Sequence, residues 1–331
     1  MKSAIIGLGV IGRVHARVLS SQENEIVALC DVDVAAAEKI KNEFAPCAKI
    51  YTDWIKMLDE VKPDAVHICT PHYLHADMVV GALDRDINVL CEKPLCIKHE
   101  DIGRILDAEA RSTAQLGVCQ QNRYLESMLM AKEYIADKEI VGAHGSVVWT
   151  RGEDYYNSAE WRGTKAQEGG GVLINQALHT LDLVQWFCGE PDEVVSSNNN
   201  YTLKGVIEVE DTLAARFYGK NSFTFFATNS APCDFPIRID IALSNSEKLT
   251  VYPNMLMING EIKLKSKQSK VLGKACYGNG HEALIADFYD CIAAGRPFAI
   301  DGKEGAKVVR MILAAYASRG EKISVIERGT L

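Results

Sequence analysis

A short apolar run that leads into a glycine-rich turn opens this chain and strongly limits the folds it can adopt. Residues 4–6 are apolar, and residues 7–12 read Gly-Leu-Gly-Val-Ile-Gly before a helical pattern begins. Similar apolar runs at 26–29, 65–69, 88–91 and 117–119 alternate with helical patterns. Apolar runs without polar alternation are typical of strands buried on both faces of a parallel sheet. The pattern predicts an α/β domain with a doubly wound parallel sheet.

The pattern changes after about residue 122. Apolar and polar residues alternate over 143–149, 212–218, 222–228 and 237–243, and helical patterns occupy 170–188, 281–294 and 303–318. Such alternation is typical of an antiparallel sheet with one covered face. We therefore predict two domains, a dinucleotide-binding domain over 1–121 and an α+β domain with a large, mainly antiparallel open sheet over 122–331.

Composition excludes several classes of function. The 36 Lys and Arg residues face 44 Asp and Glu residues, giving a net charge of -8 without a basic block, so a nucleic-acid partner is not expected. No apolar stretch is long enough to span a bilayer, and the N-terminus lacks a cleavage site for a signal peptide. The ten cysteines form no Cys-x-x-Cys motif, which favours reduced thiols. We expect a cytoplasmic protein without a membrane partner.

The glycine turn has the spacing of a dinucleotide-binding loop. Gly7 permits the tight turn, Gly9 lets a pyrophosphate approach the backbone, and Gly12 lets helix and strand pack closely. Val10 and Ile11 complete the loop at the start of a helix, where unpaired N–H groups bind anions. The sequence therefore predicts a Rossmann-type nucleotide site, and the alternative is an ordinary strand-to-helix turn.

Asp31 follows the second apolar run, about 20 residues beyond the loop, where a carboxylate accepts hydrogen bonds from an adenosine ribose. A carboxylate there repels a 2'-phosphate, and neither Cys30 nor Val32 offers a cation. The prediction is NAD rather than NADP. The alternative for Asp31 is a helix cap.

Charged residues and prolines follow two later runs of the predicted parallel sheet. Thr70-Pro71 follows the run at 65–69, and Glu92-Lys93-Pro94 follows the run at 88–91. Together with the glycine loop, these motifs resemble the Gfo/Idh/MocA family, named for glucose-fructose oxidoreductase and inositol dehydrogenase. The resemblance covers the whole first domain in order and spacing.

The resemblance implies a role for Lys93, whose family counterpart contacts both the substrate hydroxyl and the nicotinamide ribose. A lysine beside a hydride-transfer carbon stabilises a developing alkoxide, whereas the alternative is a surface ion pair with Glu92. The resemblance also implies cofactor contacts for the motif residues around it and a cis bond before Pro94. These further cofactor-site residues are Thr70, Pro71, His75 and Glu92.

Three glycines at 169–171 precede an apolar helical pattern on which Asn175, His179 and Asp182 share one face. A histidine there can be a hydrogen-bonded core residue. The resemblance implies instead that His179 is the general base and that Asn175 orients the substrate; a histidine accepts a proton near neutral pH. Many members have aspartate in place of Asn175, so either His179 works alone or Lys93 shares the proton transfer. With asparagine at position 175, the chain resembles those members of the family that act on nucleotide-linked or amino sugars.

Five further residues are candidates for substrate contact. Arg123 and Tyr124 follow the last strand of the first domain, at the cleft expected between the domains; a domain-bridging salt link is the alternative. Tyr155, Trp161 and Arg162 precede the three glycines, and aromatic and guanidinium groups suit sugar faces and anions. A lid that packs on its own domain is the alternative for this second group.

His72 and His75 lie three residues apart, but no further ligand cluster accompanies them in the sequence. A helix start that lines the cofactor site explains them better. We predict no metal.

These observations predict an NAD(P)-dependent oxidoreductase that transfers hydride between the cofactor and a secondary hydroxyl or ketone of a sugar, cyclitol or sugar derivative. One alternative is a glycoside-cleaving or eliminating enzyme that oxidises its sugar transiently. Another is a non-catalytic dinucleotide sensor, because fold alone does not determine function. The resemblance also implies a homodimer or homotetramer.

Overall fold

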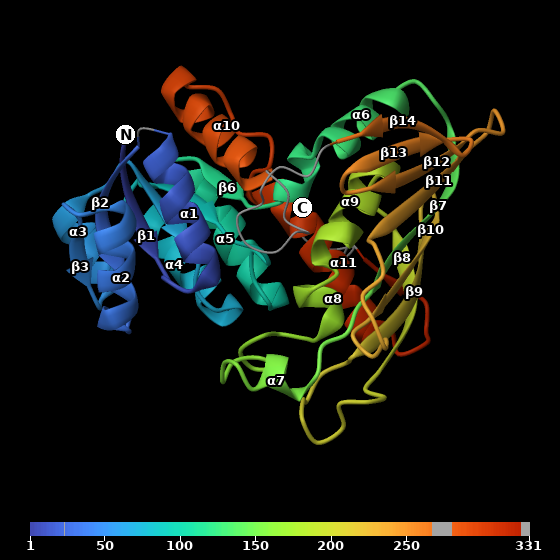
Figure 1. Cartoon of the computed structure of the whole chain (residues 1–331), viewed down its shortest axis with the longest axis horizontal. Coiled ribbons are helices and arrows are strands. Elements are labelled where there is room, and N and C mark those ends of the chain that lie inside the picture. Colours follow the sequence, from blue (N-terminus) through green and yellow to red (C-terminus); the bar gives the residue numbers. More distant parts are fainter. Residues whose placement is uncertain (23, 267–279, 326–331) are drawn as a thin grey trace. The chain divides into compact units, whose positions relative to one another are not determined.

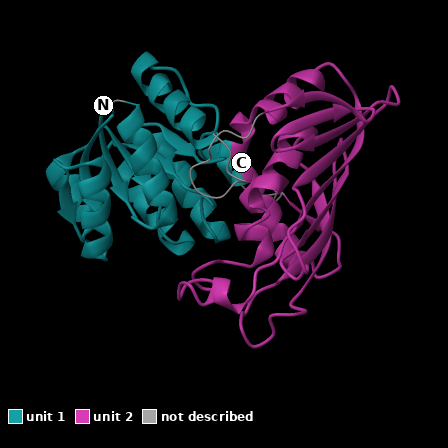
Figure 2. Ribbon diagram, in the orientation of Figure 1, with its two compact units in different colours: residues 1–121, 271–306 teal, residues 122–270, 307–331 magenta. Residues whose placement is uncertain are grey.

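The computed structural model describes the chain except for residues 23, 267–279 and 326–331. Two compact units divide it: unit 1 comprises 1–121 and 271–306, and unit 2 comprises 122–270 and 307–331 (Figure 2). The second domain is predicted over 122–331, whereas the described residues 280–306 of that range belong to unit 1.

Unit 1 is built on a six-stranded sheet in the order β3-β2-β1-β4-β5-β6. Its strands are β1 (Lys2–Ile6), β2 (Glu25–Cys30), β3 (Lys49–Tyr51), β4 (Ala65–Ile68), β5 (Asn88–Cys91) and β6 (Leu116–Val118). Every neighbouring pair is parallel, which confirms the predicted doubly wound sheet. The sequence analysis missed β3, which is only three residues long.

Helices flank this sheet (Figure 1). They are α1 (Val10–Ser21), α2 (Val34–Phe44), α3 (Trp54–Val61), α4 (His75–Leu83), α5 (His99–Arg111) and α10 (Gly280–Ala294). α10 comes from the late segment and packs against α1. Tyr289 of α10 bonds Ser3 of β1, with 2.6 Å between the hydroxyl oxygens, and Phe288 lies over Gly117 of β6. These buried contacts explain why 280–294 folds with unit 1.

Unit 2 contains a nine-stranded sheet in the order β14-β13-β12-β11-β7-β10-β9-β8-β15. Its strands are β7 (Ile140–Val148), β8 (Glu193–Asn199), β9 (Thr212–Tyr218), β10 (Phe223–Thr228), β11 (Arg238–Leu243), β12 (Lys248–Tyr252), β13 (Met255–Ile258), β14 (Glu261–Lys265) and β15 (Ile323–Ser324). β7 and β10 run parallel and the other neighbours antiparallel. The prediction of a mainly antiparallel sheet is therefore confirmed.

One face of this sheet is covered. Unit 2 contains α6 (Glu126–Tyr134), α7 (Glu153–Tyr156), α8 (Val172–Asn175), α9 (Leu178–Cys188) and the part of α11 (Gly302–Ser318) from residue 307 on. α9 packs on β7 and β10, α8 on β9 and β10, and α6 on β12 and β13. Buried and exposed residues alternate along β9 and β11, as expected when helices cover only one face.

The single helix predicted over 170–188 is wrong in one respect, because it consists of two helices, α8 and α9. The N–H of Ala177 donates to the carbonyl of Val172, five residues back, and that of Thr180 to the carbonyl of Ala177. This wide turn interrupts the regular four-residue ladder, so the face predicted for Asn175 and His179 is not one continuous helical stripe.

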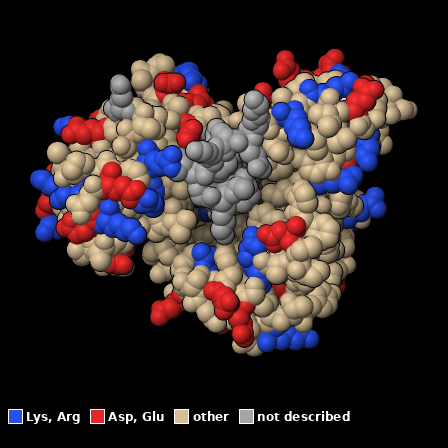
Figure 3. All heavy atoms as spheres, viewed as in Figure 1, with Lys and Arg blue, Asp and Glu red and all other residues tan. Residues whose placement is uncertain are grey.

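The distribution of charged side chains and the length of the helices agree with the expectations from the composition. Figure 3 shows basic and acidic side chains interspersed on the visible face of the molecule. Within the described residues, no helix is both long enough and apolar enough to cross a bilayer.

A buried ion pair anchors α9 within unit 2. Arg123 Nε and Nη2 donate to the two carboxylate oxygens of Asp182, at 2.7 and 2.6 Å. Both side chains are about 95% buried or more, and the guanidinium stacks on Trp186, 5.5 Å from the ring centre. A bidentate pair in such a setting is sensitive to loss of one partner, because the remaining charge cannot reach water.

Asp182→Asn is expected to lower the free energy of unfolding by about 3 kcal/mol, because it leaves the Arg123 guanidinium buried without its counter-charge. Urea unfolding followed by tryptophan fluorescence measures this. The double variant Arg123→Met with Asp182→Leu is the control, and it should lose less stability than Asp182→Asn. A loss below about 0.5 kcal/mol in the single variant would contradict the structural role of the pair.

Candidate functional site

The glycine loop combines two packed glycines with an open one. Gly7 has a φ of +87°, and a Cβ there would lie 2.6 Å from the backbone of Cys69. A Cβ on Gly12 would lie 2.0 Å from the Gly7 carbonyl oxygen. In contrast, a Cβ on Gly9 would meet no atom within 4 Å. Close packing therefore explains why residues 7 and 12 are glycines. The open space beside Gly9 instead fits the close approach of a ligand phosphate.

The other loop residues also fit a dinucleotide. Gly9 is the N-cap of α1, and Val10 in its first turn is 74% exposed. Asp31 turns its carboxylate toward the loop, because Oδ2 accepts a hydrogen bond from Leu8 N at 2.6 Å. The cap of α2 is Asp33 rather than Asp31. Asp31 thus lies at the end of β2 beside the glycine loop, as ribose recognition requires.

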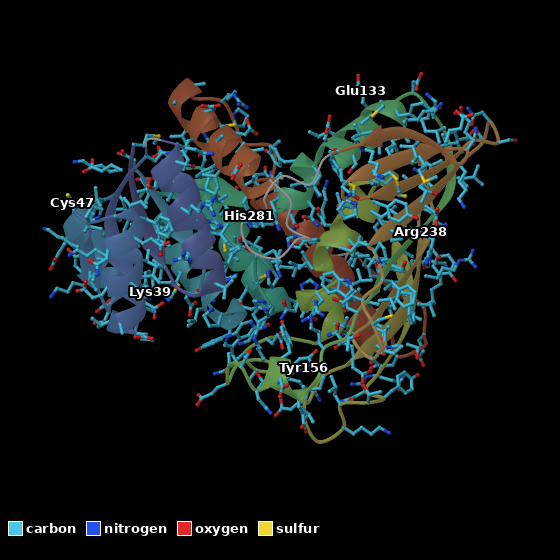
Figure 4. The ribbon with its side chains drawn as sticks, in the orientation of Figure 1. Lys39, Cys47, Glu133, Tyr156, Arg238 and His281 are labelled. Atoms are coloured by element: carbon cyan, nitrogen blue, oxygen red, sulfur yellow. The ribbon has the colours of Figure 1, made fainter. Side chains whose placement is uncertain are left out.

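Glu92 is held in a buried hydrogen-bond network. Glu92 Oε1 lies 3.0 Å from His15 Nε2 of α1 and 3.3 Å from His281 Nε2. His281 lies in the first turn of α10 (Figure 4). His15 Nδ1 lies 2.7 Å from His67 Nδ1 of β4, and His67 Nε2 lies 2.9 Å from the hydroxyl of Tyr289. The segment after β5 is thus joined by hydrogen bonds to β4 and to the helices α1 and α10, and Tyr289 extends the network to Ser3 of β1.

The network keeps charge on the carboxylate. Burial alone would raise the pKa of Glu92, but hydrogen bonds from His15 and His281 hold that pKa well below its ordinary value. Burial lowers the pKa of His15, against the opposing effect of Glu92, and lowers the pKa of His67 much further. A neutral His15 that donates from Nε2 to the ionised Glu92, and accepts at Nδ1 from a neutral His67, is consistent with these directions.

Lys93 extends from this anchored position. Its backbone N–H donates to Glu92 Oε2 at 3.1 Å, and the Lys93–Pro94 bond is cis, as the resemblance implied. His75 is fully buried, with Nδ1 2.7 Å from the Pro94 carbonyl oxygen and Nε2 2.9 Å from that of Thr70. His75 therefore ties the segment after β4 to the segment after β5, and a direct contact with a cofactor stays a prediction.

The histidines near the loop do not form a cluster of their own. His72 and His75 have ring centres 6.0 Å apart, and His75 has both nitrogens next to backbone carbonyls. Pro71 is the N-cap of the short helix 72–74. Among the described residues, His15, Glu92 and His281 have atoms that could bind a metal ion, and these atoms lie within 4.8 Å of one another. The hydrogen bonds of Glu92 with the two histidines account for this proximity.

In unit 2, the structure surrounds Asn175 with polar partners. Its Nδ2 donates to Glu168 Oε1 and, at 3.2 Å, to the hydroxyl of Tyr155. His179 lies in the first turn of α9 and is 8% exposed. Asn175 and Tyr155, predicted separately, are therefore direct neighbours.

Tyr155 and Arg162 form one aromatic and cationic cluster with Trp161. The Arg162 guanidinium lies 4.4 Å from the Tyr155 ring centre and 4.7 Å from that of Trp161. Its Nη1 also donates to the Tyr155 hydroxyl. These three predicted residues thus come together beside Asn175. Stacked rings and a guanidinium provide a surface that suits a sugar ring or an anion.

The remaining predicted residues are placed differently. Arg123 is engaged by Asp182, so the structure gives it an ion pair inside unit 2, and its substrate contact stays a prediction. Tyr124 ends the short helix Gln121–Tyr124 and is half-buried. A pocket of about 460 Å³ in unit 2 is lined by none of the predicted residues; Lys165, Asn199 and Arg319 are among those that line it.

Sequence reasoning missed the residues that support the site. His15, His67 and His281 engage or extend toward Glu92, Tyr289 extends the chain of contacts, and Glu168 contacts Asn175. The sequence does carry a signal for His15 and His67, because each is a polar residue at a buried position of an apolar helix or strand. Such a residue requires a hydrogen-bond partner. Nothing local in the sequence identifies those partners.

A matched pair of substitutions tests the glycine loop. Gly9→Ala should change the free energy of unfolding by about 1 kcal/mol or less, because its Cβ meets no protein atom. It should weaken NADH binding about tenfold or more, because the methyl group occupies the space beside the loop. Gly12→Ala should instead cost about 2 kcal/mol or more through its clash with Gly7. Urea unfolding and NADH fluorescence titration measure both, and unaltered NADH affinity in Gly9→Ala contradicts the assignment.

The buried histidines predict a pH dependence of stability. Because the pKa values of His15 and His67 are lowered in the folded state, the unfolded chain binds protons below about pH 6.5 that the folded chain does not. These two histidines should therefore make the free energy of unfolding fall as pH decreases below about 6.5, by about 1 kcal/mol per pH unit for each of them. Glu210, whose pKa burial raises to about 7, contributes in the opposite direction. Glu92 contributes only at lower pH, since its pKa is also lowered.

Urea unfolding between about pH 8 and pH 5.5 measures this dependence. His67→Gln should retain a hydrogen-bonding side chain and show a smaller slope, because it removes one titrating group. Equal slopes for the two proteins would show that His67 titrates alike in the folded and unfolded states.

Comparisons with known proteins match both parts of the chain. A family model described as "Oxidoreductase family, NAD-binding Rossmann fold" matches residues 1–120, and the GFO/IDH/MocA C-terminal domain matches residues 128–245. The two ranges together cover more than two thirds of the chain.

Named relatives match over nearly the full length. The inositol 2-dehydrogenase of Salmonella typhimurium is 28% identical over 305 residues, which cover 90% of this chain and 87% of that protein. The myo-inositol 2-dehydrogenase of Thermotoga maritima is 22% identical, with 98% of each chain covered. The WlbA dehydrogenase from Chromobacterium violaceum, solved with NADH and UDP-GlcNAcA, has a TM-score of 0.87 at 25% identity and covers 99% of this chain and 97% of its own. With both of its domain models matched in order, the chain belongs to the Gfo/Idh/MocA oxidoreductase family.

Proposed function

We propose that this protein is an NAD-dependent dehydrogenase that oxidises a secondary hydroxyl group of a sugar, a cyclitol or a sugar derivative, or reduces the corresponding ketone. The observation that carries the proposal is the anchored Glu92-Lys93 segment. A buried carboxylate with three hydrogen-bonding partners, His15, His281 and the Lys93 N–H, holds Lys93 at the carboxyl end of β5, on the same sheet as the open Gly9 loop. Ligands of open α/β sheets bind at this edge.

The relatives support the substrate class. Proteins named as dehydrogenases of inositol, glucosides, glucose 6-phosphate and levoglucosan all match this chain. The substrates given in these names each contain a ring that carries several hydroxyl groups. The cluster of Tyr155, Trp161 and Arg162 beside Asn175 suits such a ring, because aromatic faces pack on C–H surfaces and the polar groups bind hydroxyls or an anion.

In the proposed reaction, bound NAD supplies the hydride acceptor, and the protein binds, orients and moves a proton. Backbone N–H groups of the Gly7–Gly12 loop would hold the pyrophosphate, and Asp31 would accept hydrogen bonds from the ribose. Lys93 stabilises the negative charge that develops on the reacting oxygen, and His179 accepts its proton. Asn175 orients the substrate.

The two units divide these tasks. Unit 1 contains the residues proposed to hold the dinucleotide, and unit 2 contains those proposed to bind the substrate, including Arg123 and Tyr124. We also propose a homodimer or homotetramer, supported by the family resemblance and by the sheet face of unit 2 that carries no helix in Figure 1.

Lys93→Ala and His179→Ala are each expected to lower kcat by about 100-fold or more while leaving NADH binding intact, because each removes a group that acts in the transition state. Absorbance at 340 nm over a panel of cyclitols, sugars and sugar acids, with NAD and with NADP, measures turnover. Lys39→Ala and Lys220→Ala alter exposed lysines and serve as controls.

Normal rates in both variants would overturn the catalytic assignment. NADH binding by the wild type without turnover on any panel member would favour a sensor. Substrate cleavage without net NADH would favour transient oxidation. The last two outcomes both leave the absorbance at 340 nm unchanged, and analysis of the substrate for cleavage products distinguishes them.

A further inference from the structure

Glu168 is a fully buried acid in the segment just before the three glycines of unit 2. Its Oε2 accepts a hydrogen bond from Gly163 N, and its Oε1 accepts one from Asn175 Nδ2. Gly163 has a φ of +71°, so the loop turns sharply where it meets the carboxylate. Glu168 therefore links this loop to the end of α8, where Asn175 lies.

The chemistry of the contact determines how the Asn175 amide is oriented. An ionised carboxylate only accepts hydrogen bonds, and in an amide side chain only the nitrogen donates them. Glu168 therefore attracts Nδ2 and repels Oδ1. The reversed orientation would place two acceptor oxygens in contact inside the protein, which is unfavourable.

Tyr155 supports the same orientation. Its hydroxyl oxygen accepts from Arg162 Nη1, from Gln176 Nε2 at 2.9 Å and from Asn175 Nδ2 at 3.2 Å. The two hydrogens of Asn175 Nδ2 are thus directed to Glu168 and Tyr155, and Oδ1 is turned away from both.

We propose that Glu168 is a positioning residue that holds Asn175 with Oδ1 presented as a neutral acceptor for a hydroxyl group of the substrate. The inference rests on the proposed function, which it deepens. It requires a substrate with a hydroxyl group that donates to Asn175, in addition to the oxidised one. It also explains why this chain has an amide at 175, because a carboxylate there would contact Glu168, and two carboxylates in contact cannot both ionise freely.

Three variants test this arrangement by changing which side chain donates the hydrogen bond between residues 168 and 175. Glu168→Gln removes the constraint on the amide and should lower kcat on the preferred substrate about tenfold, with the KM for NAD unchanged. Asn175→Asp should lose more at pH 8 and regain activity relative to wild type toward pH 6, because a shared proton then restores a hydrogen bond between the two acids.

The double variant Glu168→Gln with Asn175→Asp reverses the direction of the contact, since the new amide donates to the new carboxylate. It should be at least tenfold more active than Asn175→Asp at pH 8 and should lose that variant's excess pH dependence. Glu160→Gln is the matched control, because it makes the same change at an exposed acid in the same segment and should match the wild type.

Thermal unfolding separates this inference from the proposed function. Asn175→Asp should have a lower Tm than the double variant at pH 8, and the difference should shrink at pH 6, whether or not any substrate is turned over. A wild type without NAD-linked turnover that still shows this Tm pattern would overturn the proposed function and retain the contact. Equal Tm values and equal pH profiles for Asn175→Asp and the double variant would overturn the role of Glu168, as would wild-type kcat in Glu168→Gln.

Discussion

The ionised carboxylate of Glu92 is the interaction on which unit 1 most depends. An isolated charge at this depth would be strongly unfavourable, so its partners are structural requirements. Those partners come from α1, from the start of α10 and from the backbone of Lys93. The helix that begins at the glycine loop and the lysine proposed for catalysis are therefore attached to the same group, although 77 residues separate His15 from Glu92.

Unit 2 uses a buried acid in a related way. Glu168 and Glu92 each lie beside a proposed functional residue, and each contacts it through an N–H group. Neither acid is assigned a chemical step. Their carboxylate oxygens accept hydrogen bonds from neighbouring N–H groups, and these contacts restrict the orientations open to those groups. Precise placement of this kind is what catalysis by orientation requires.

Local patterns were sufficient for much of the fold and for part of the site. The Gly7–Gly12 loop, the strands β7, β9, β10 and β11 and the position of Lys93 after β5 follow from periodicity and from motifs within a few residues. The seven-residue strand β8 was not predicted. The break at Ala177 was missed because apolar residues continue through it, and β3 because three residues carry little periodic signal. The partners of Glu92 and Glu168 depend on contacts between distant segments, which one sequence does not reveal.

The late segment that contains α10 has a consequence for synthesis of the chain. As the ribosome releases the protein from its N-terminus, β1 to β6 emerge long before Phe288 and Tyr289, whose side chains complete the interior around Gly117 and His67. The interior of unit 1 therefore stays incomplete while the strands of unit 2 are translated. An N-terminal fragment ending at residue 121 lacks these side chains, and a chaperone that shields apolar surface would have its main task during that interval.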